Sequence, residues 1–277
     1  MRFLKSFLLM AVVNLCFVVM ITAFLAAFHL HLSLAAFAVI FGFAGAFLSL
    51  FLSRFILKRR FHMQRINPTT PGVHAQLYQI LAAVCAKAEM PVPQLWLYVD
   101  GRPNAFTTGI TRKGAMIAMS TGLVNAMNGD QIAGVLSHEL GHIHNGDMLS
   151  TTLLLGLMNS YVIWLGNLAG RYFGGNFITE FLTTVVFEMA LSFLALIPIT
   201  AFSRHREYAA DAFSAKVLGS APLISALATL DHFVPDTNPR KDALATAYIH
   251  GPWKGIFATH PSTEKRIKRL KEFSLLT

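Results

Sequence analysis

The chain has 277 residues, of which 54% are hydrophobic and 13% are charged, and its formal net charge is +9. This composition is too apolar for an ordinary soluble domain and too often interrupted for a bundle made only of membrane helices. The basic residues cluster beside apolar segments, which favours a membrane surface over nucleic acid as the partner of the positive charge. Cys16 and Cys85 are too far apart in context to predict a disulfide or a thiolate metal site, in agreement with a reducing cytoplasm.

Two uncharged segments near the start of the chain, Phe7–Leu30 and Leu32–Ser53, are each long enough to cross about 30 Å of hydrocarbon as a helix. No clear signal-peptide cleavage site followed by polar sequence lies between them, so we expect both to remain as a membrane hairpin. The turn of this hairpin contains no Lys or Arg. Basic residues lie before and after the hairpin: Arg2, Lys5, Arg54, Lys58, Arg59, Arg60 and Arg65. This distribution predicts that both ends of the hairpin face the cytoplasm.

A second apolar hairpin is predicted over Met148–Gly170 and Phe177–Phe202, with a connecting loop whose only basic residue is Arg171. Arg204 and Arg206 follow the second segment. The same charge rule therefore places both ends of this hairpin in the cytoplasm as well.

Ionisable side chains inside hydrocarbon are costly, so Glu180 and Glu188 in the last apolar segment require an explanation. In one interpretation they line a water-filled or substrate-accessible groove. In the other, Glu180 lies at the interface and Glu188 pairs within the bundle, or the segment is tilted or partly outside lipid. Pro198 is expected to kink the end of this helix.

The more polar parts of the chain have the pattern of a small sheet with helices. Runs rich in β-forming residues, bounded by turn signals, predict three strands: Gln94–Val99, Ala105–Ile110 and Ala115–Met119. Helical spacing and helix-start residues predict three helices: Val73–Ala88, Leu223–Phe233 and Thr263–Phe273. Asp236–Lys241 is expected to be a loop.

The segment His138-Glu139-Leu140-Gly141-His142 carries the strongest chemical signal in the chain. The capping residues Asn128-Gly129-Asp130 and the apolar run that follows them predict that this segment lies on a helix. Residues four apart project from one helix face, so His138 and His142 can bind one metal ion. Two neutral imidazoles suit Zn²⁺, which lowers the pKa of a bound water towards roughly 7, and Glu139 can complete the deprotonation. The pattern indicates hydrolysis; the alternative is two surface histidines on an amphipathic helix.

Glu207 is the best third metal ligand, because catalytic zinc sites usually have three protein ligands and one open position. Asp211 lies one turn further along the same helix face and is placed to accept a hydrogen bond from the second nitrogen of a ligating histidine, which we expect to be His138. The alternative is that Glu207 merely pairs with Arg204 and that Asp211 is solvated. His144 is expected to point away from the metal as a polar or structural residue.

Four motifs occur together in this chain: His138-Glu139-Leu140-Gly141-His142, Glu207-x-x-x-Asp211, Arg102-Pro103-Asn104-Ala105-Phe106, and Thr259-His260-Pro261-Ser262-Thr263 with Arg266. Their combination resembles the HtpX family of membrane zinc metalloendopeptidases, relatives of the CAAX prenyl endopeptidases. The resemblance implies an α+β zincin-like metalloprotease domain with a small sheet, combined with four transmembrane helices in two hairpins. The implied division has four parts: a transmembrane hairpin with its basic flank (1–60), the first part of the protease domain (61–150), a second hydrophobic hairpin (151–203) and the second part of the protease domain (204–277).

The resemblance also implies roles for individual residues. One Zn²⁺ per chain would be bound by His138, His142 and Glu207, with Glu139 as the catalytic base and Asp211 behind the ligands. Asn104, Ala105 and Phe106 would lie on the edge strand of the cleft, where an extended substrate adds as another strand; read alone, Asn104 is an ordinary residue between a turn and a strand. His260 would donate a hydrogen bond to the substrate or the oxyanion, although by itself it marks only a loop before a helix. Arg266 is expected to be structural.

The implied function is the cleavage of membrane or misfolded membrane-associated proteins at the cytoplasmic face of a bacterial inner membrane, in protein quality control under stress. Its partners would be polypeptide substrates and the lipid bilayer, without nucleic acid; the oligomeric state is left open. One competing interpretation is a zinc-stabilised membrane scaffold or chaperone-like protein, against which the open three-ligand arrangement and Glu139 argue. Another is a small transporter that uses Glu180 and Glu188.

Overall fold

The computed structural model describes residues 34–69, 72–109, 111–231 and 260–276. The chain divides into two compact units. We call Met1–Phe47 with Thr152–Pro198 the helical unit, and Leu48–Thr151 with Ile199–Thr277 the mixed unit. The predicted apolar helix Phe7–Leu30, Cys16 and the predicted loop Asp236–Lys241 lie outside the described residues.

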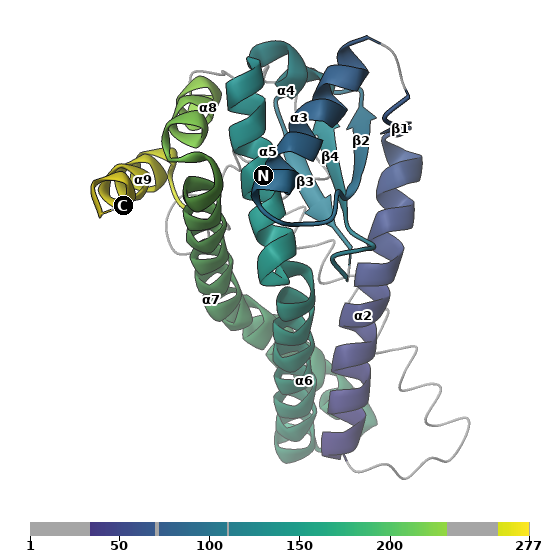
Figure 1. The fold of residues 1–277 in the computed structure, drawn as a ribbon. Helices are drawn as coiled ribbons and strands as arrows, with labels where there is room; N and C mark the ends of the chain where they lie inside the picture. Colours follow the sequence, from purple (N-terminus) through teal and green to yellow (C-terminus); the bar gives the residue numbers. More distant parts are fainter. Residues whose placement is uncertain (1–33, 70–71, 110, 232–259, 277) are drawn as a thin grey trace. The chain divides into compact units, whose positions relative to one another are not determined.

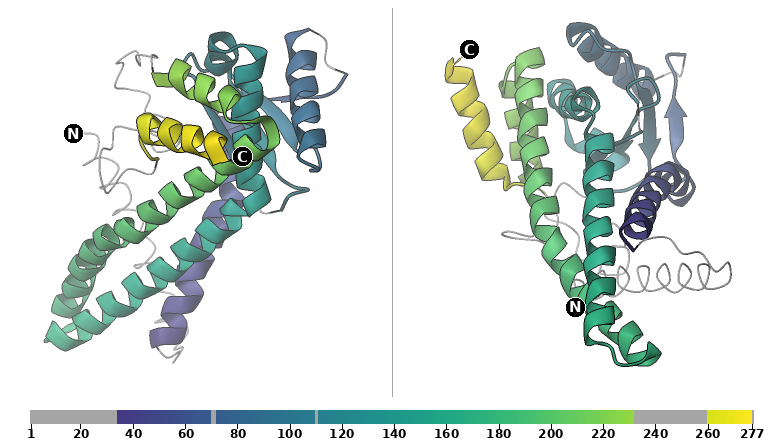
Figure 2. Two further views of the ribbon diagram at one scale, coloured as in Figure 1. Left: turned by 60° about the vertical axis from the view of Figure 1, so that its left-hand side comes forward. Right: turned by 90° about the horizontal axis from the view of Figure 1, so that it is seen from below.

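Three long apolar helices occur among the described residues: α2 (Leu34–Arg60), α6 (Asp147–Phe173) and α7 (Phe177–Leu218). Each is long and apolar enough to cross a membrane, which confirms that the last three predicted apolar segments are helical. Both views of Figure 2 show α6 and α7 joined by a short turn. Pro198 lies inside α7, which continues beyond the predicted end at Phe202 to Leu218. The kink expected at this proline stays a prediction.

Within the helical unit, α6 and α7 approach each other closely because small residues lie between them. A β-carbon on Gly170 would overlap the side chain of Thr184. Glu188 is buried nearby, and its Oε1 accepts a 3.4 Å hydrogen bond from Nδ2 of Asn167. This contact corresponds to the interpretation in which Glu188 pairs within the bundle, whereas Glu180 is exposed in the first turn of α7.

The mixed unit is built on a sheet of the order β1-β2-β4-β3. Its strands are β1 (Gln64–Ile66), β2 (Gln94–Tyr98), β3 (Ala105–Thr108) and β4 (Met116–Ser120). β2 and β4 are parallel, and the two outer pairs are antiparallel. The three predicted strands are confirmed to within two residues at each end; β1 is too short and too polar for the sequence pattern to have indicated it.

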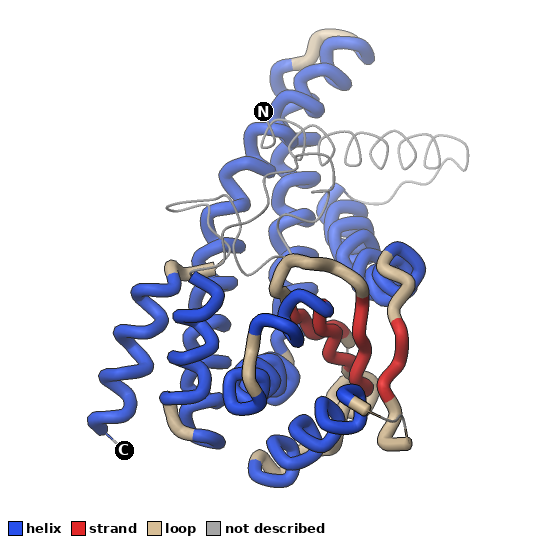
Figure 3. The backbone as a smooth tube through the Cα atoms, turned by 90° about the horizontal axis from the view of Figure 1, so that it is seen from above, coloured by secondary structure: helices blue, strands red, loops and turns tan. Residues whose placement is uncertain are grey.

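Both faces of the sheet are covered, as the alternation along β4 shows. Ile117 and Met119 belong to the main core, together with residues of α3 (Val73–Lys87) and α5 (Gly129–Asn145). Met116 and Ala118 point to the other face, where they pack with Tyr98 in a cluster that also includes Phe61. Figure 3 shows the strands side by side with the helices around them. β4, buried on both faces, is therefore the centre of the mixed unit, and the short helix α4 (Thr121–Ala126) follows it directly.

Helix α5 packs against the sheet and against α8 (Ala221–Asp231), and α9 (Thr263–Leu276) packs in turn against α8. Its start is fixed by a capping box, in which the Asn128 side chain accepts from the Gln131 amide and the Gln131 side chain accepts from the Asn128 amide. A β-carbon on Gly134 would overlap the backbone of Leu223 in α8, and one on Gly141 would overlap Ala210 in α7. The two glycines thus let α8 and α7 lie directly against α5.

Candidate metal centre and cleft

Three metal-binding side chains meet where α5 and α7 touch. His138 and His142 project from one face of α5, and their Nε2 atoms lie 3.2 Å apart. Glu207 comes from α7, with its Oε2 3.6 Å from Nε2 of His138 and its Oε1 3.5 Å from Nε2 of His142. All three are buried, and their candidate ligand atoms all lie within 4.8 Å of one another.

These separations fit a small tetrahedral cation. Bonds of about 2.0–2.1 Å at tetrahedral angles place neighbouring ligand atoms roughly 3.3 Å apart, close to the 3.2, 3.5 and 3.6 Å found between the three side chains. Two imidazole nitrogens and one carboxylate are also a ligand set that Zn²⁺ takes in hydrolytic sites. The residues present therefore fit a zinc ion.

Behind His138 lies an ion pair between Asp211 and Arg266. Nδ1 of His138 lies 2.9 Å from Oδ1 of Asp211, and Arg266 donates to both carboxylate oxygens of Asp211 over 2.6 and 2.9 Å. Burial by itself raises the pKa of Asp211, but the charge of Arg266 and the hydrogen bonds from His138 and Arg266 lower it to about 2. Asp211 is therefore ionised and accepts the Nδ1 proton of His138, so that Nε2 points to Glu207.

The other histidine, His142, also contacts a carboxylate. Gly146 ends α5 in the left-handed conformation with φ 69°, and the chain turns at once into α6. This turn brings Oδ2 of Asp147 to 2.6 Å from Nδ1 of His142. Arg206 donates to the backbone carbonyl of Asp147 over 3.0 Å and also contacts the hydroxyl of Thr151.

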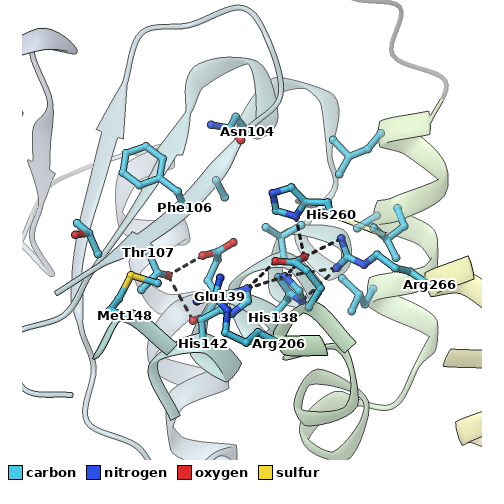
Figure 4. A pocket seen from close by; sticks show the side chains of 18 of the residues that line it. Asn104, Phe106, Thr107, His138, Glu139, His142, Met148, Arg206, His260 and Arg266 are labelled. Carbon is cyan, nitrogen blue, oxygen red and sulfur yellow. Dashed lines mark hydrogen bonds and ion pairs between the residues drawn. The ribbon is translucent and has the colours of Figure 1, made fainter. Parts of the chain in front are cut away.

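Glu139 lies beside the two histidines but outside the group of ligand atoms. Its Oε2 accepts a 2.6 Å hydrogen bond from the hydroxyl of Thr107 on β3. Figure 4 shows this carboxylate facing the same space as the imidazoles of His138 and His142. The carboxylate of Glu139 thus lies next to the candidate metal site without belonging to the group of ligand atoms.

His260 approaches the centre from the segment before α9. Its Nδ1 lies 3.1 Å from Oε2 of Glu207, and its side chain is 26% exposed. Burial alone raises the pKa of Glu207, but the charge of His260 and the hydrogen bonds from His138 and His260 hold that pKa well below its usual range. His260 therefore helps to keep Glu207 ionised, and its other ring nitrogen remains for a further contact.

A cavity of about 340 Å³ opens in front of these residues. Its polar wall consists of the ligand cluster with Glu139, His260 and Arg266, and its other walls are largely apolar, including Val135 and Leu227. Ala105 and Phe106 of β3 also line it. β3 lies at one end of the sheet, and no strand among the described residues pairs with its outer side.

Asn104 lies just before β3 and is almost completely buried. Its backbone amide donates to the hydroxyl of Ser120, and its Nδ2 donates to the hydroxyl of Tyr98 over 2.9 Å. Within the described part of the chain, its Oδ1 has no hydrogen-bond partner. Asn104 thus positions the start of the edge strand and lines the cavity at the same time.

Three residues of the site were not predicted from the sequence: Thr107, Asp147 and Arg206. Thr107 has no local pattern that could reveal its contact with Glu139, and Arg206 was considered only as a basic flank. A Gly-Asp pair directly after a metal-binding helix is a usable signal for Asp147, because glycine allows the sharp turn that returns the next side chain to the helix end. His144 is exposed and packs against Phe213, away from the ligand cluster.

The fold and the site define a metallopeptidase of the His-Glu-x-x-His type, with a candidate third ligand from another helix. A family model for peptidase family M48 matches residues 71–274 of this chain. The chain belongs to this family of zinc metalloproteases, and it is therefore a metalloendopeptidase.

Relatives with known names are similar to this chain over most of its length. The chain is 35% identical over 265 residues to a protease HtpX homolog of Polaromonas naphthalenivorans, covering 91% of this chain and 90% of the relative. It is 37% identical over 246 residues to a protease HtpX homolog of Neisseria meningitidis, covering 86% and 87%. These similarities, together with the apolar helices, make the protein an HtpX-like membrane metalloprotease.

The fold is also similar to a solved structure, that of S. mikatae Ste24p, with a TM-score of 0.67 at 19% sequence identity. The similarity covers 97% of this chain, which spans only 65% of the Ste24p chain. This likeness supports the fold of the chain.

Proposed function

We propose that this protein is a zinc endopeptidase that cleaves membrane or misfolded membrane-associated polypeptides at the cytoplasmic face of a bacterial inner membrane, in protein quality control. The observation that carries the proposal is the placement of the metal ligands. Asp147, the first residue of apolar helix α6, contacts His142, and Glu207 lies on the same continuous helix as the apolar part of α7. A site built from the ends of membrane-type helices is suited to substrates presented by the bilayer.

His138, His142 and Glu207 are the residues that would bind the zinc ion, with Asp211 orienting the imidazole of His138. When bound, zinc supplies Lewis-acid polarisation of a carbonyl and lowers the pKa of water. Glu139 then acts as general base, taking the proton of the attacking water on a carboxylate oxygen and passing it to the departing amine. His260 supports the reaction by donating a hydrogen bond to the substrate or to the developing oxyanion.

The edge strand β3 would bind the substrate by strand addition. Its outer side has no partner strand among the described residues, and it runs along the cavity beside Glu139. An extended peptide placed there gains backbone hydrogen bonds, which are independent of its sequence. Ala105 and Phe106 line the cavity beneath such a peptide, and Asn104 positions the start of the strand through its hydrogen bonds with Ser120 and Tyr98.

The proposed topology has four transmembrane helices in two hairpins, with Phe7–Leu30 as the first helix and α2, α6 and α7 as the others. The protease domain, of the zincin type, would lie in the cytoplasm in two parts, 61–150 and 204–277. The charge distribution supports this orientation, because basic residues lie in the last turns of α2 and after the apolar part of α7. Alkaline phosphatase fused in the loop after Phe173 should be active, and a fusion at the C-terminus should be inactive.

The test of the reaction is a comparison between the parent protein and Glu139→Gln, both purified with zinc. We expect the variant to keep its zinc content and its melting temperature while losing the cleavage of a model membrane substrate. His138→Ala and Glu207→Ala should instead lose the metal. Chelation should stop cleavage by the parent, and added zinc should restore it.

A Glu139→Gln variant that still cut the substrate at the parent rate would exclude the proposed role of Glu139. The same variant, expressed in cells, should also retain bound substrates, because binding persists without turnover. Identification of those polypeptides then tests the substrate class directly: a set without membrane proteins would contradict the proposal.

A further inference from the structure

We propose that Asp147 is a positioning residue for the metal centre, which orients His142 as a ligand in the same way as Asp211 orients His138. The inference rests on the proposed function, because it assigns to Asp147 a role in zinc binding. Asp147 is outside the His-Glu-x-x-His motif and on a different helix from Glu207.

The two histidines have matching surroundings. Each directs its Nδ1 atom at a buried aspartate, His138 at Asp211 over 2.9 Å and His142 at Asp147 over 2.6 Å. Both aspartates are 3% exposed, so neither contact is a chance pairing on the surface. The Nε2 atoms of both rings consequently point to Glu207.

A carboxylate behind a ligating imidazole has two physical effects. It holds the proton on Nδ1, which leaves the lone pair of Nε2 for the metal, and it fixes the rotation of the ring. It also makes the imidazole a stronger donor to the metal.

Arg206 fixes the backbone that carries Asp147. Its Nη1 donates to the carbonyl of Asp147, and it also contacts Thr151 one turn later. Because Arg206 immediately precedes Glu207, the first turn of α6 is tied to the helix that supplies the third ligand. Asp147 is therefore linked to two ligands. Its side chain contacts His142, and its carbonyl accepts a hydrogen bond from Arg206, the residue before Glu207.

The experiment compares Asp147→Ser with Asp130→Ser in the full-length protein in detergent. Both aspartates lie in the first turn of a helix, but Asp130 is exposed at the start of α5. Both substitutions remove a favourable charge from a helix N-terminus, whereas only the first removes a contact with a histidine. The affinity for Zn²⁺ is measured by competition with a chromophoric chelator, and the melting temperature is measured without metal.

We expect Asp147→Ser to weaken zinc binding by about 10–100-fold and Asp130→Ser to leave it within about twofold of the parent. Asp147→Asn keeps the shape and a neutral acceptor, so its affinity should lie between those of the parent and Asp147→Ser. It also decides the question if Asp147→Ser does not fold. With Co²⁺ in place of zinc, the visible absorption bands of the Asp147 variants should shift relative to the parent.

Equal zinc affinity in the parent and both Asp147 variants would overturn the inference and leave the proposed function intact. Equal losses in Asp147→Ser and Asp130→Ser would also overturn it, because the loss would then come from the helix terminus. A parent protein that binds no zinc would instead refute the proposed function itself, and the inference with it.

Discussion

The hydroxyl of Thr107 donates a 2.6 Å hydrogen bond to Oε2 of Glu139, and this bond joins the edge strand to the metal-binding helix at the proposed general base. A hydrogen bond to a charged group contributes about 1.5–3 kcal/mol, so this bond holds the carboxylate of Glu139 in one orientation. Without the bond the carboxylate can rotate. We expect Thr107→Val to lower kcat by roughly tenfold with unchanged zinc content. Thr107→Ser keeps the hydroxyl and should retain most of the activity; equal activity in Thr107→Val and the parent would show that the bond has no catalytic role.

Gly141 lets α5 and α7 touch at the ligand cluster. A β-carbon there would lie 2.9 Å from Cα and 3.0 Å from the carbonyl oxygen of Ala210. Overpacking of this kind costs about 1–3 kcal/mol, which exceeds the gain of roughly 1 kcal/mol from the better helix propensity of alanine. Gly141→Ala should therefore lower the free energy of unfolding and weaken zinc binding, because it moves His142 away from Glu207.

Gly129→Ala is the matched control on the same helix, since its added methyl meets only the end of Ile80 at 3.9 Å. Chemical denaturation in detergent, with and without zinc, measures both effects. A Gly141→Ala protein as stable as the Gly129→Ala protein would contradict the close approach of the two helices.

Arg266 lies inside the site, where it compensates the negative charge of Asp211 and approaches Glu207 to 3.5 Å. We expect Arg266→Met to lower the free energy of unfolding by about 3–5 kcal/mol, because it leaves buried carboxylates without their partner. Arg269 lies one turn further along α9, is exposed and covers the ring of Tyr208 at 4.2 Å. Arg269→Met should therefore cost no more than about 1 kcal/mol, and similar losses for both variants in urea titrations would contradict this assignment.

Cys85 is buried in the core between α3 and the sheet, and burial raises the pKa of its thiol from 9.0 to about 11. Below pH 9 the thiol is neutral in both states; as the pH rises from 9 to 11 it ionises first in the unfolded chain. Its contribution to stability is thus present below about pH 9 and is lost as the pH rises through the folded pKa. In a Cys16→Ser background, alkylation at pH 8.5 should be at least about a hundredfold slower in the folded than in the unfolded protein; equal rates would refute the burial of the thiol.

Local patterns predicted the parts of the site that lie within one helix. The pairing of His138 with His142 follows from residues four apart sharing a helix face, and the capping box at Asn128 marks the start of that helix. Strands β2, β3 and β4 were also predicted, because their runs are long enough to show β-forming residues between turns. β1, with only three residues, and α4, with six, were missed because such short elements are determined by what they pack against.

The contacts of Arg266 could not be predicted from such local patterns. In the sequence it is one of several basic residues in a terminal helix, and it was expected to be structural. The structure places its guanidinium between Asp211 and Glu207, because α9 packs against α8 and thereby reaches the metal centre. Nothing in the spacing of the residues indicates that contact.

The sequence by itself therefore determined the chemistry of the protein: a helix with two histidines and a glutamate, apolar segments of membrane length, and a carboxylate just after the last of them as the candidate third ligand. These features depend on helix periodicity and hydropathy, and both are determined by residues close together in the chain. The tertiary structure alone decided how each group is held, with Asp147 behind His142, Thr107 on Glu139 and Arg266 on Asp211. Those contacts depend on glycine turns and on close packing between helices and strands, and no local pattern encodes the distance between two separate elements.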